Sequence, residues 1–457
     1  MSEKRRAVFL VDGEHHPDTV RGAVRALAER ENLEPLALYF LGGAEKLGDA
    51  SELSVEGCAL VVPEDPLGDF VKTLERFSPH VVLDLSDLPV LGPAMRMRMA
   101  ATALARGVAY LGADFEFRPP RRERVLTKPS CAVIGTGKRC GKTAVSAEMA
   151  RYLARTGREP LVVAMGRGGP PRPYVVEERV VDEEYLQGEL GKGLHAASDH
   201  YEDAMVSGVV TVGSRRCGGG MAGEPFVTNC AEAAAVAESL PGRVVIVEGS
   251  GSSVPPVLTD TSVLVVSAAQ DLEEALGYLG AYRLLISDGV IITMAEEPFA
   301  SSRRIQELRE RMEWISGDVV VLNTIFRPHP LKPIRGRKVF LVATAPPEAR
   351  ELLEKHLREK EGCEVLGSSF NLSRRDRLVS DLGGADEAEV VLTELKAAAV
   401  DVVARYARRR GKELVFFHNV PVPTGGDMDL ERFFETMWAK ATERSCPQKK
   451  TKKGKTG

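Results

Sequence analysis

The sequence predicts an α/β fold in which a central P-loop nucleotide-binding domain with a mostly parallel sheet is flanked by N-terminal and C-terminal α/β units. Two observations predict this fold. Short apolar runs alternate with segments of helical periodicity along most of the 457 residues, an order typical of parallel sheets with helices on both faces. In addition, the apolar run 131–134 leads into a glycine-rich turn and then a helical pattern ending near Gly157, the context that a phosphate-binding loop requires.

The turn after this run is the most informative stretch of the chain. It reads GTGKRCGKT, which resembles the Walker A motif. Glycines let backbone N–H groups approach a phosphate because no Cβ blocks the way. Lys142 would neutralise phosphate oxygens, with Lys138 beside it in a second catalytic role, and the Thr143 hydroxyl would bind Mg²⁺. The residues expected to bind the nucleotide are Gly135, Thr136, Gly137, Lys138, Arg139, Cys140, Gly141, Lys142 and Thr143.

The spacing of this turn departs from the usual G-x-x-x-x-G-K-[ST] pattern. Thr136 occupies the first position of the motif, with Gly135 one place before it and Gly137 one place after it. An ordinary glycine-rich loop before a helix is the alternative interpretation. The GKT triplet between a strand and a helix favours the nucleotide site.

Length and composition indicate several domains in a cytoplasmic protein. No apolar run approaches the roughly 20 residues of a membrane span, and the N-terminal segment has no signal-peptide pattern. Seven cysteines without a C-x-x-C pair argue against both a disulfide framework and a zinc ribbon. The predicted divisions are a Rossmann-like N-terminal domain at 1–125, the P-loop domain at 126–335, a C-terminal α/β domain at 336–446 and a disordered basic tail at 447–457.

The charge distribution argues against nucleic acid as a partner. The net charge is −4, and the tail 447–457 contributes five lysines and no acidic residue, so the remainder of the chain is more acidic than the whole. Nucleic-acid binders carry basic patches instead. A basic anchoring arm is one interpretation of the tail, and a solvated chain end is the other.

The N-terminal unit carries polar residues where its first strand ends. Asp12, Glu14 and His15 follow the apolar run 7–11, and open α/β sheets bind ligands at the carboxyl ends of their strands. We therefore expect these three residues to contribute to substrate binding, although capping of loops and helices would also explain them. The further elements expected in this unit are helices at 19–30, 67–77 and 93–106 and strands at 36–41, 59–62, 81–85 and 109–111.

Two arginine- and glycine-rich loops in the central domain predict a second anion site. Arg167 and Arg172 follow the apolar run 161–165, and Arg215 and Arg216 follow the run 209–212 and precede three successive glycines. Guanidinium groups bind phosphate oxygens in pairs, so the four arginines are expected to bind substrate. The acidic run 182–184 is interpreted as a solvated turn or as an approach to the metal.

Two later strands of the central domain end in polar residues with expected roles. Glu248 follows the expected strand 243–247, which is apolar after Arg243, and P-loop proteins place the acid that directs Mg²⁺ at such a strand end. It is therefore expected to hold the metal together with Thr143 and to take part in catalysis. Asn323 ends the run 319–322, where its amide could contact a nucleotide base or cap a turn.

The C-terminal unit alternates strands and helices but shows no combination of a nucleophile and a base. Strands are expected at 339–343, 364–366 and 413–420, and helices at 346–359, 387–410 and 430–442. The proline- and glycine-rich segment 421–427 is interpreted as a loop that could cover a site.

Two families resemble this chain. The P-loop and the strand end Glu248-Gly249-Ser250-Gly251 resemble the dethiobiotin synthetase branch of P-loop proteins, over the central domain alone. The whole layout, with the N-terminal segment VDGEH, the loop GTGKRCGKT and the arginine-rich loops, resembles the cyclic 2,3-diphosphoglycerate synthetases. This second resemblance implies a ligase that uses ATP and Mg²⁺ to form an intramolecular phosphoanhydride in 2,3-diphosphoglycerate, releasing ADP and phosphate.

Two other functions fit parts of the sequence. An ATP-dependent ligase that acts on a carboxylate would need fewer cationic residues than a bisphosphate demands. A nucleotide-operated switch or metal chaperone would usually carry dense Cys and His clusters, for which His15 and His16 give thin support. The expected partners are a small-molecule substrate and a second copy of the chain in a homodimer, with neither nucleic acid nor membrane.

Overall fold

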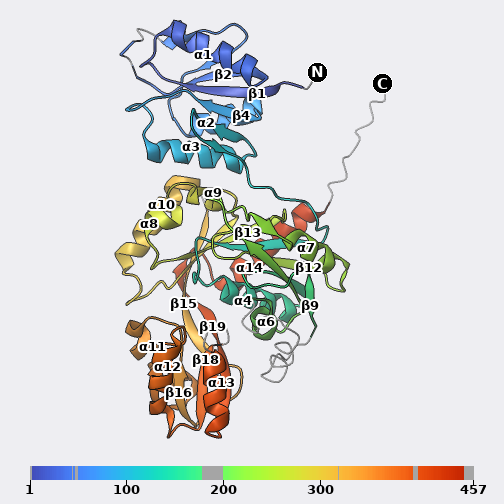
Figure 1. The fold of residues 1–457 in the computed structure, drawn as a ribbon, viewed down its shortest axis with the longest axis vertical. Helices are drawn as coiled ribbons and strands as arrows, with labels where there is room; N and C mark the ends of the chain where they lie inside the picture. Colours follow the sequence, from blue (N-terminus) through green and yellow to red (C-terminus); the bar gives the residue numbers. More distant parts are fainter. Residues whose placement is uncertain are drawn as a thin grey trace. The chain divides into compact units, whose positions relative to one another are not determined.

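The computed structural model describes residues 3–43, 45–46, 50–177, 199–317, 319–394 and 400–446 (Figure 1). Within them the chain forms two compact units, Met1–Arg121 with Asp271–Ile286, and Arg122–Gln270 with Ser287–Gly457. The basic tail 447–457 and the acidic run 182–184 lie outside the described residues. No described helix is both long and apolar enough to cross a membrane.

The first unit contains a sheet with strand order β3-β2-β1-β4-β5-β6. All its neighbouring strands are parallel except β5 and β6. The strand order reverses between β1 and β4, and the carboxyl ends at such a reversal are where open α/β sheets bind ligands. The elements are β1 Arg5–Val11, α1 Pro17–Arg30, β2 Leu33–Phe40, η1 Ala50–Leu53, β3 Ala59–Val61, α2 Gly68–Phe77, β4 Val81–Asp84, α3 Pro93–Ala105, β5 Ala109–Leu111, β6 Glu116–Phe117, α8 Leu272–Leu276 and α9 Gly280–Leu285.

The second unit contains a long sheet with strand order β11-β10-β8-β12-β7-β13-β14-β15-β19-β18-β16-β17. The apolar strand β7 lies between β12 and β13, so it is buried on both faces and at both edges. The first half of this unit comprises β7 Ser130–Gly135, α4 Lys142–Arg155, β8 Pro160–Gly166, β9 Tyr174–Val176, α6 Asp199–Ser207, β10 Thr211–Cys217, β11 Val227–Thr228, α7 Cys230–Ser239, β12 Val244–Glu248, β13 Thr261–Ser267, β14 Gly289–Thr293, α10 Ser302–Ser316 and β15 Val320–Pro330.

Strands β15 and β19 connect the P-loop part of this sheet to the C-terminal part (Figure 1). β15 is parallel to β14 at its start and antiparallel to β19 along the rest of its length. The C-terminal elements are β16 Lys338–Val342, η2 Pro347–Ala349, α11 Arg350–His356, the π-helical turn η3 Leu357–Glu361, β17 Glu364–Ser369, α12 Arg375–Asp381, η4 Leu382–Ala385, β18 Val390–Glu394, α13 Val400–Arg409, β19 Glu413–Gly426 and α14 Leu430–Ser445.

Three expectations about these elements are wrong. The helix expected at 387–410 begins instead with β18, because a short apolar run buried on both faces cannot be distinguished from a buried helix by periodicity. The expected loop 421–427 is largely strand β19. Pro421 and Pro423 are tolerated there because, among the described residues, this end of β19 pairs only with β15, which leaves its other edge without ladder bonds to them. Arg215 and Arg216, which were expected on a loop, lie on strand β10.

Helix α14 returns from the C-terminal part and completes the core beneath the P-loop. Its buried residues follow helical spacing and pack in one cluster with residues of β7, β13 and α4. The buried residues of α14 are Leu430, Phe433, Phe434, Met437, Trp438 and Ala441.

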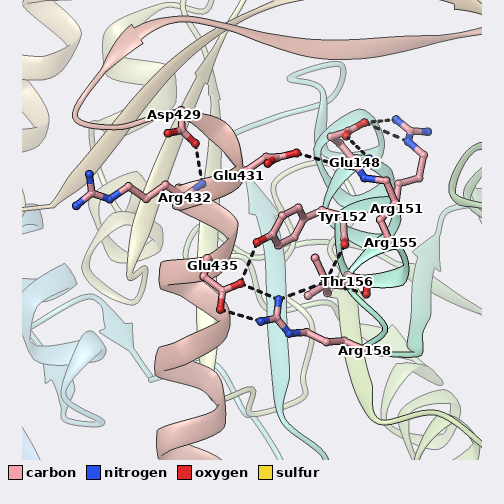
Figure 2. A network of polar contacts seen from close by, with 11 residues as sticks. Glu148, Arg151, Tyr152, Arg155, Thr156, Arg158, Asp429, Glu431, Arg432 and Glu435 are labelled. Atoms are coloured by element: carbon pink, nitrogen blue, oxygen red, sulfur yellow. Dashed lines mark hydrogen bonds and ion pairs between the residues drawn. The ribbon is translucent and has the colours of Figure 1, made fainter.

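Polar contacts fix α14 beside the P-loop helix α4, as Figure 2 shows. Arg158 donates hydrogen bonds of 2.7 and 2.8 Å to the two carboxylate oxygens of Glu435, and the Tyr152 hydroxyl donates to the same carboxylate over 2.9 Å. The hydrogen bonds from Arg158 lower the pKa of Glu435, so this carboxylate stays charged. Arg155 contacts Glu431 over 3.1 Å. The far end of α4 is therefore held by α14.

We expect Phe434→Ala to lower the free energy of unfolding by about 3–5 kcal/mol, the usual cost of removing a buried phenyl ring. Phe434 is 1% exposed within the shared core. Urea unfolding of the full chain would measure the change. Phe226→Ala is the matched control because Phe226 is 92% exposed, and equal losses in the two variants would contradict the role assigned to α14.

Candidate active site

The P-loop has the geometry that its glycines predict. β7 delivers the chain to Gly135, and α4 begins at Lys142. Gly141 has φ +97°, and a Cβ at this position would lie 2.2 Å from Cζ of Phe326 on β15. A Cβ on Gly135 would lie 2.6 Å from the Cys140 sulfur. A side chain at either position would displace these neighbouring side chains, and the left-handed backbone of Gly141 favours glycine.

Hydrogen bonds made by the buried residues Cys140 and Thr293 fix the middle of the P-loop. Cys140 is buried, and its thiol donates to the Gly137 carbonyl over 3.3 Å. The Thr293 hydroxyl, at the end of β14, donates to the Cys140 carbonyl over 2.7 Å. Lys138 and Arg139 lie at the exposed tip, where Arg139 adopts φ +63°. The buried side of the loop is thus fixed, and its cationic tip faces solvent.

Lys142 connects the P-loop to the segment after β12. Its ammonium group donates to the carbonyls of Gly137 over 3.0 Å and of Gly251 over 2.9 Å, and the residue is 7% exposed. The ammonium group also donates to the Cys140 sulfur over 3.6 Å. A buried ammonium held by these uncharged acceptors can accept an anionic partner at low desolvation cost, because most of its water has already been removed.

Thr143 and Glu248 form a pair suited to a magnesium ion. The Thr143 hydroxyl donates to Oε1 of Glu248 over 2.7 Å, and Glu248 is 4% exposed. Oε2 of Glu248 is buried without a hydrogen-bond partner among the described residues. An unpartnered buried carboxylate oxygen is costly, and Mg²⁺ prefers a few oxygen ligands supplemented by phosphates and water. These two side chains therefore fit the ion.

Two of the four predicted arginines meet at the segment after β12. Arg216 donates to the carbonyls of Ser250 and Gly218 over 2.8 and 2.9 Å. A Cβ on Gly251 would lie 2.7 Å from Nη2 of Arg167 and 3.0 Å from Nη2 of Arg216. Burial and the positive charge of Arg167 lower the pKa of Arg216, and its Nε is buried without a hydrogen-bond partner among the described residues. Two guanidinium groups this close favour an anion between them.

The structure does not bring the other two arginines to this point. Arg215 precedes Arg216 on strand β10, so the two side chains point to opposite faces, and Arg215 is exposed. Arg172 is also exposed. Asn323 lies on β15, part-buried, and its Oδ1 has no hydrogen-bond partner among the described residues.

The N-terminal residues of interest form a cluster within their own unit. Asp12 is fully buried and accepts hydrogen bonds from the His15 ring over 2.7 Å and from the Asp87 backbone over 2.6 Å. Desolvation and the neighbouring Glu45 and Asp12 raise the pKa of Glu14. This neighbourhood is acidic, so it would bind a phosphate only with a cation between them.

Sequence reasoning missed three residues around the P-loop. Phe326 packs on Gly141, Thr293 holds the Cys140 carbonyl, and Gln270 accepts a hydrogen bond of 2.6 Å from the Thr136 hydroxyl. Thr293 ends β14 and Gln270 follows β13, whereas Phe326 lies in the middle of β15. Position near a strand end is the signal that the sequence offers for Thr293 and Gln270, and it does not distinguish them from loop caps. Phe326 carries no such signal.

Comparisons with known proteins cover nearly the whole chain. Family models described as the N-terminal, P-loop and C-terminal domains of cyclic 2,3-diphosphoglycerate synthetase match residues 6–118, 130–325 and 330–420. A cyclic 2,3-diphosphoglycerate synthetase of Rubrobacter xylanophilus is 50% identical over 93% of this chain and 96% of its own. Proteins of the same name from Methanothermobacter thermautotrophicus and Methanothermus fervidus are 40% and 42% identical, over 94% and 92% of this chain and 95% and 94% of theirs.

Proposed function

Because the chain belongs to the cyclic 2,3-diphosphoglycerate synthetase family, we propose that it uses ATP to close an intramolecular phosphoanhydride in 2,3-diphosphoglycerate. The products are cyclic 2,3-diphosphoglycerate, ADP and phosphate. One observation carries the assignment to this site: Lys142, Arg167 and Arg216 converge on Gly251, beside the pair Thr143 and Glu248.

The reaction would proceed in two steps. An oxygen of one substrate phosphate attacks the terminal phosphorus of ATP, so that a linear anhydride forms and ADP leaves. An oxygen of the other substrate phosphate then attacks the phosphorus of the activated substrate phosphate, closing the ring and releasing the transferred group as inorganic phosphate. Both steps need positioning and charge neutralisation more than a protein nucleophile.

The cationic residues divide these tasks. Lys142, with Lys138 at the loop tip, neutralises the transferring phosphoryl group, while Arg167 and Arg216 hold the two substrate phosphates near each other. Thr143 and Glu248 would hold Mg²⁺, which supplies charge stabilisation at the phosphate oxygens. Arg172, which is exposed after β8, and Arg215, which is exposed on strand β10, remain proposed substrate contacts. Asn323 remains the proposed contact for the base, and Asp12, Glu14 and His15 a proposed second substrate contact.

Phosphorus NMR of a mixture of the protein, ATP, Mg²⁺ and 2,3-diphosphoglycerate tests this function. We expect new resonances of a cyclic anhydride to appear in step with ADP and phosphate. Production of ADP that no small phosphorylated acid stimulates would indicate a nucleotide switch instead. Stimulation by a substrate carboxylate without phosphate groups would indicate the dethiobiotin-type ligase.

We expect Arg216→Ala to raise KM for 2,3-diphosphoglycerate by about 10- to 100-fold, the range for a lost hydrogen bond to a charged group. KM for ATP should change little. Arg243→Ala is the matched control, because Arg243 is an exposed arginine paired with Glu159. An unchanged KM for the substrate in Arg216→Ala would remove Arg216 from the substrate site.

The proposal also covers the cellular compartment, the domain division and the oligomeric state of the protein. All seven cysteines are free, which fits a reducing compartment, so we place the reaction in the cytoplasm. The division into domains at 1–125, 126–335 and 336–446 and the association into homodimers are also part of this proposal.

A further inference from the structure

Gln270 is a polar residue next to the P-loop to which the proposed mechanism gives no role. It follows β13, the strand that pairs with the P-loop strand β7. The Thr136 hydroxyl donates to Oε1 of Gln270 over 2.6 Å. The Gln270 backbone is held on both sides, since its N–H donates to the Ser267 carbonyl over 3.1 Å and its carbonyl accepts from Arg304 over 2.6 Å. The side chain therefore extends from a fixed point.

The amide group of Gln270 also lies against the backbone of the P-loop. A Cβ on Gly137 would lie 3.2 Å from Nε2 of Gln270 and 3.6 Å from its amide carbon. Because Thr136 contacts the amide oxygen, the two N–H donors of Nε2 lie on the side nearer Gly137. The Gln270 side chain thus accepts a hydrogen bond from Thr136 and occupies the space beside Gly137.

The hydrogen bond between Thr136 and Gln270 explains why this P-loop has a threonine at the first position of the motif. The usual first glycine is replaced by Thr136, which is buried and finds its hydrogen-bond partner in Gln270. Gly137 remains a glycine, and a side chain there would crowd the Gln270 amide. The second half of the loop needs no such support, because α4 and Thr293 already fix it.

We propose that Gln270 is a positioning residue for phosphoryl transfer, which acts through Thr136 to hold the first half of the P-loop in the shape that wraps the terminal phosphate of ATP. This inference rests on the proposed function.

The test separates phosphoryl transfer from nucleotide binding. We expect Gln270→Ala to lower kcat for ATP turnover about 10-fold, the upper range for one neutral hydrogen bond. The affinity for ADP, measured by calorimetry, should change less than about twofold, because the helix N-terminus that binds the inner phosphates forms without Gln270. A merely structural role would lower ADP affinity as much as kcat, and that result would overturn the proposal.

Variants of Thr136 test the proposed route. Thr136→Val removes the hydroxyl and should lower kcat about as much as Gln270→Ala, whereas Thr136→Ser keeps the hydroxyl and should retain kcat within about threefold. The double variant Gln270→Ala with Thr136→Val should show the loss of one variant, not the product of both. Multiplied losses would mean that the two residues act separately and would refute the coupling.

Two controls keep this result independent of the fold and of the proposed function. Gln306→Ala removes an exposed glutamine amide that contacts only Glu310 among the described residues, and it should leave kcat and Tm unchanged. Wild-type product formation in phosphorus NMR reports on the proposed function. The role of Gln270 is tested by comparing the loss of kcat with the change in ADP affinity in Gln270→Ala. This comparison holds whichever acid accepts the phosphoryl group.

Discussion

Lys142→Met should lower kcat by about 10³-fold or more while the chain still folds, because it removes the cation that neutralises the transferring phosphoryl group. The methionine side chain keeps most of the buried volume. The two carbonyls that Lys142 contacts, those of Gly137 and Gly251, lose a donor, so a modest fall in Tm is expected as well. Initial rates of ADP release at saturating ATP would measure the effect.

The matched control for this variant is Lys355→Met. Lys355 is an exposed lysine whose ammonium group lies 3.9 Å from Glu359 on the helical turn that follows, and exposed pairs of this kind contribute little to stability. Near-normal ATP turnover by Lys142→Met would exclude the P-loop as the site of phosphoryl transfer. If Lys142→Met has so low a Tm that it does not fold, Lys142→Arg tests the same role. Arginine keeps the charge but not the compact ammonium geometry, so we expect this variant to have a low kcat as well.

Glu248→Gln should lower kcat about 100-fold at ordinary Mg²⁺ concentrations and shift the Mg²⁺ titration to higher concentration. The amide has the same shape and can still accept the Thr143 hydroxyl hydrogen bond, but it lacks the charge that attracts the ion. A loss of 10- to 100-fold is typical when a carboxylate supporting a metal is changed. Rates measured across a Mg²⁺ series would separate the two effects.

Glu159→Gln is the control for the loss of a carboxylate, because Glu159 is exposed and paired with Arg243. A Mg²⁺ titration that is the same in Glu248→Gln and in the wild type would remove Glu248 from the metal site. In that case Oε2 of Glu248, which is buried without a partner among the described residues, would have to accept a hydrogen bond from another group.

The chemical content of the P-loop could be predicted from the sequence because it depends on local order. A strand, a turn with Gly135 and Gly141 and a helix starting at Lys142 are adjacent in the chain, so no long-range contact is needed to recognise them. The position of Glu248 at the end of its strand was also predictable, and the parallel pairing of β12 with β7 brings the carboxyl ends of both strands to one edge. Its role in metal binding stays a prediction.

Contacts between distant segments were not predictable in this way. Arg215 and Arg216 are equivalent in the sequence, yet the alternation of β10 directs only Arg216 toward Ser250. The run at 390–394 became β18 because strands on both of its sides pair with it, and periodicity alone could not show those neighbours.

The sequence by itself determined the α/β class, the P-loop and the type of charge around it, because these follow from apolar periodicity and from residues close together in the chain. Only the tertiary structure decided that segment Asp271–Ile286 belongs with the N-terminal unit, that α14 completes the P-loop core and that Gln270 supports Thr136. The physical reason is that each of these contacts joins residues far apart in sequence. Their pairing depends on how the sheets and helices pack, which no local pattern encodes.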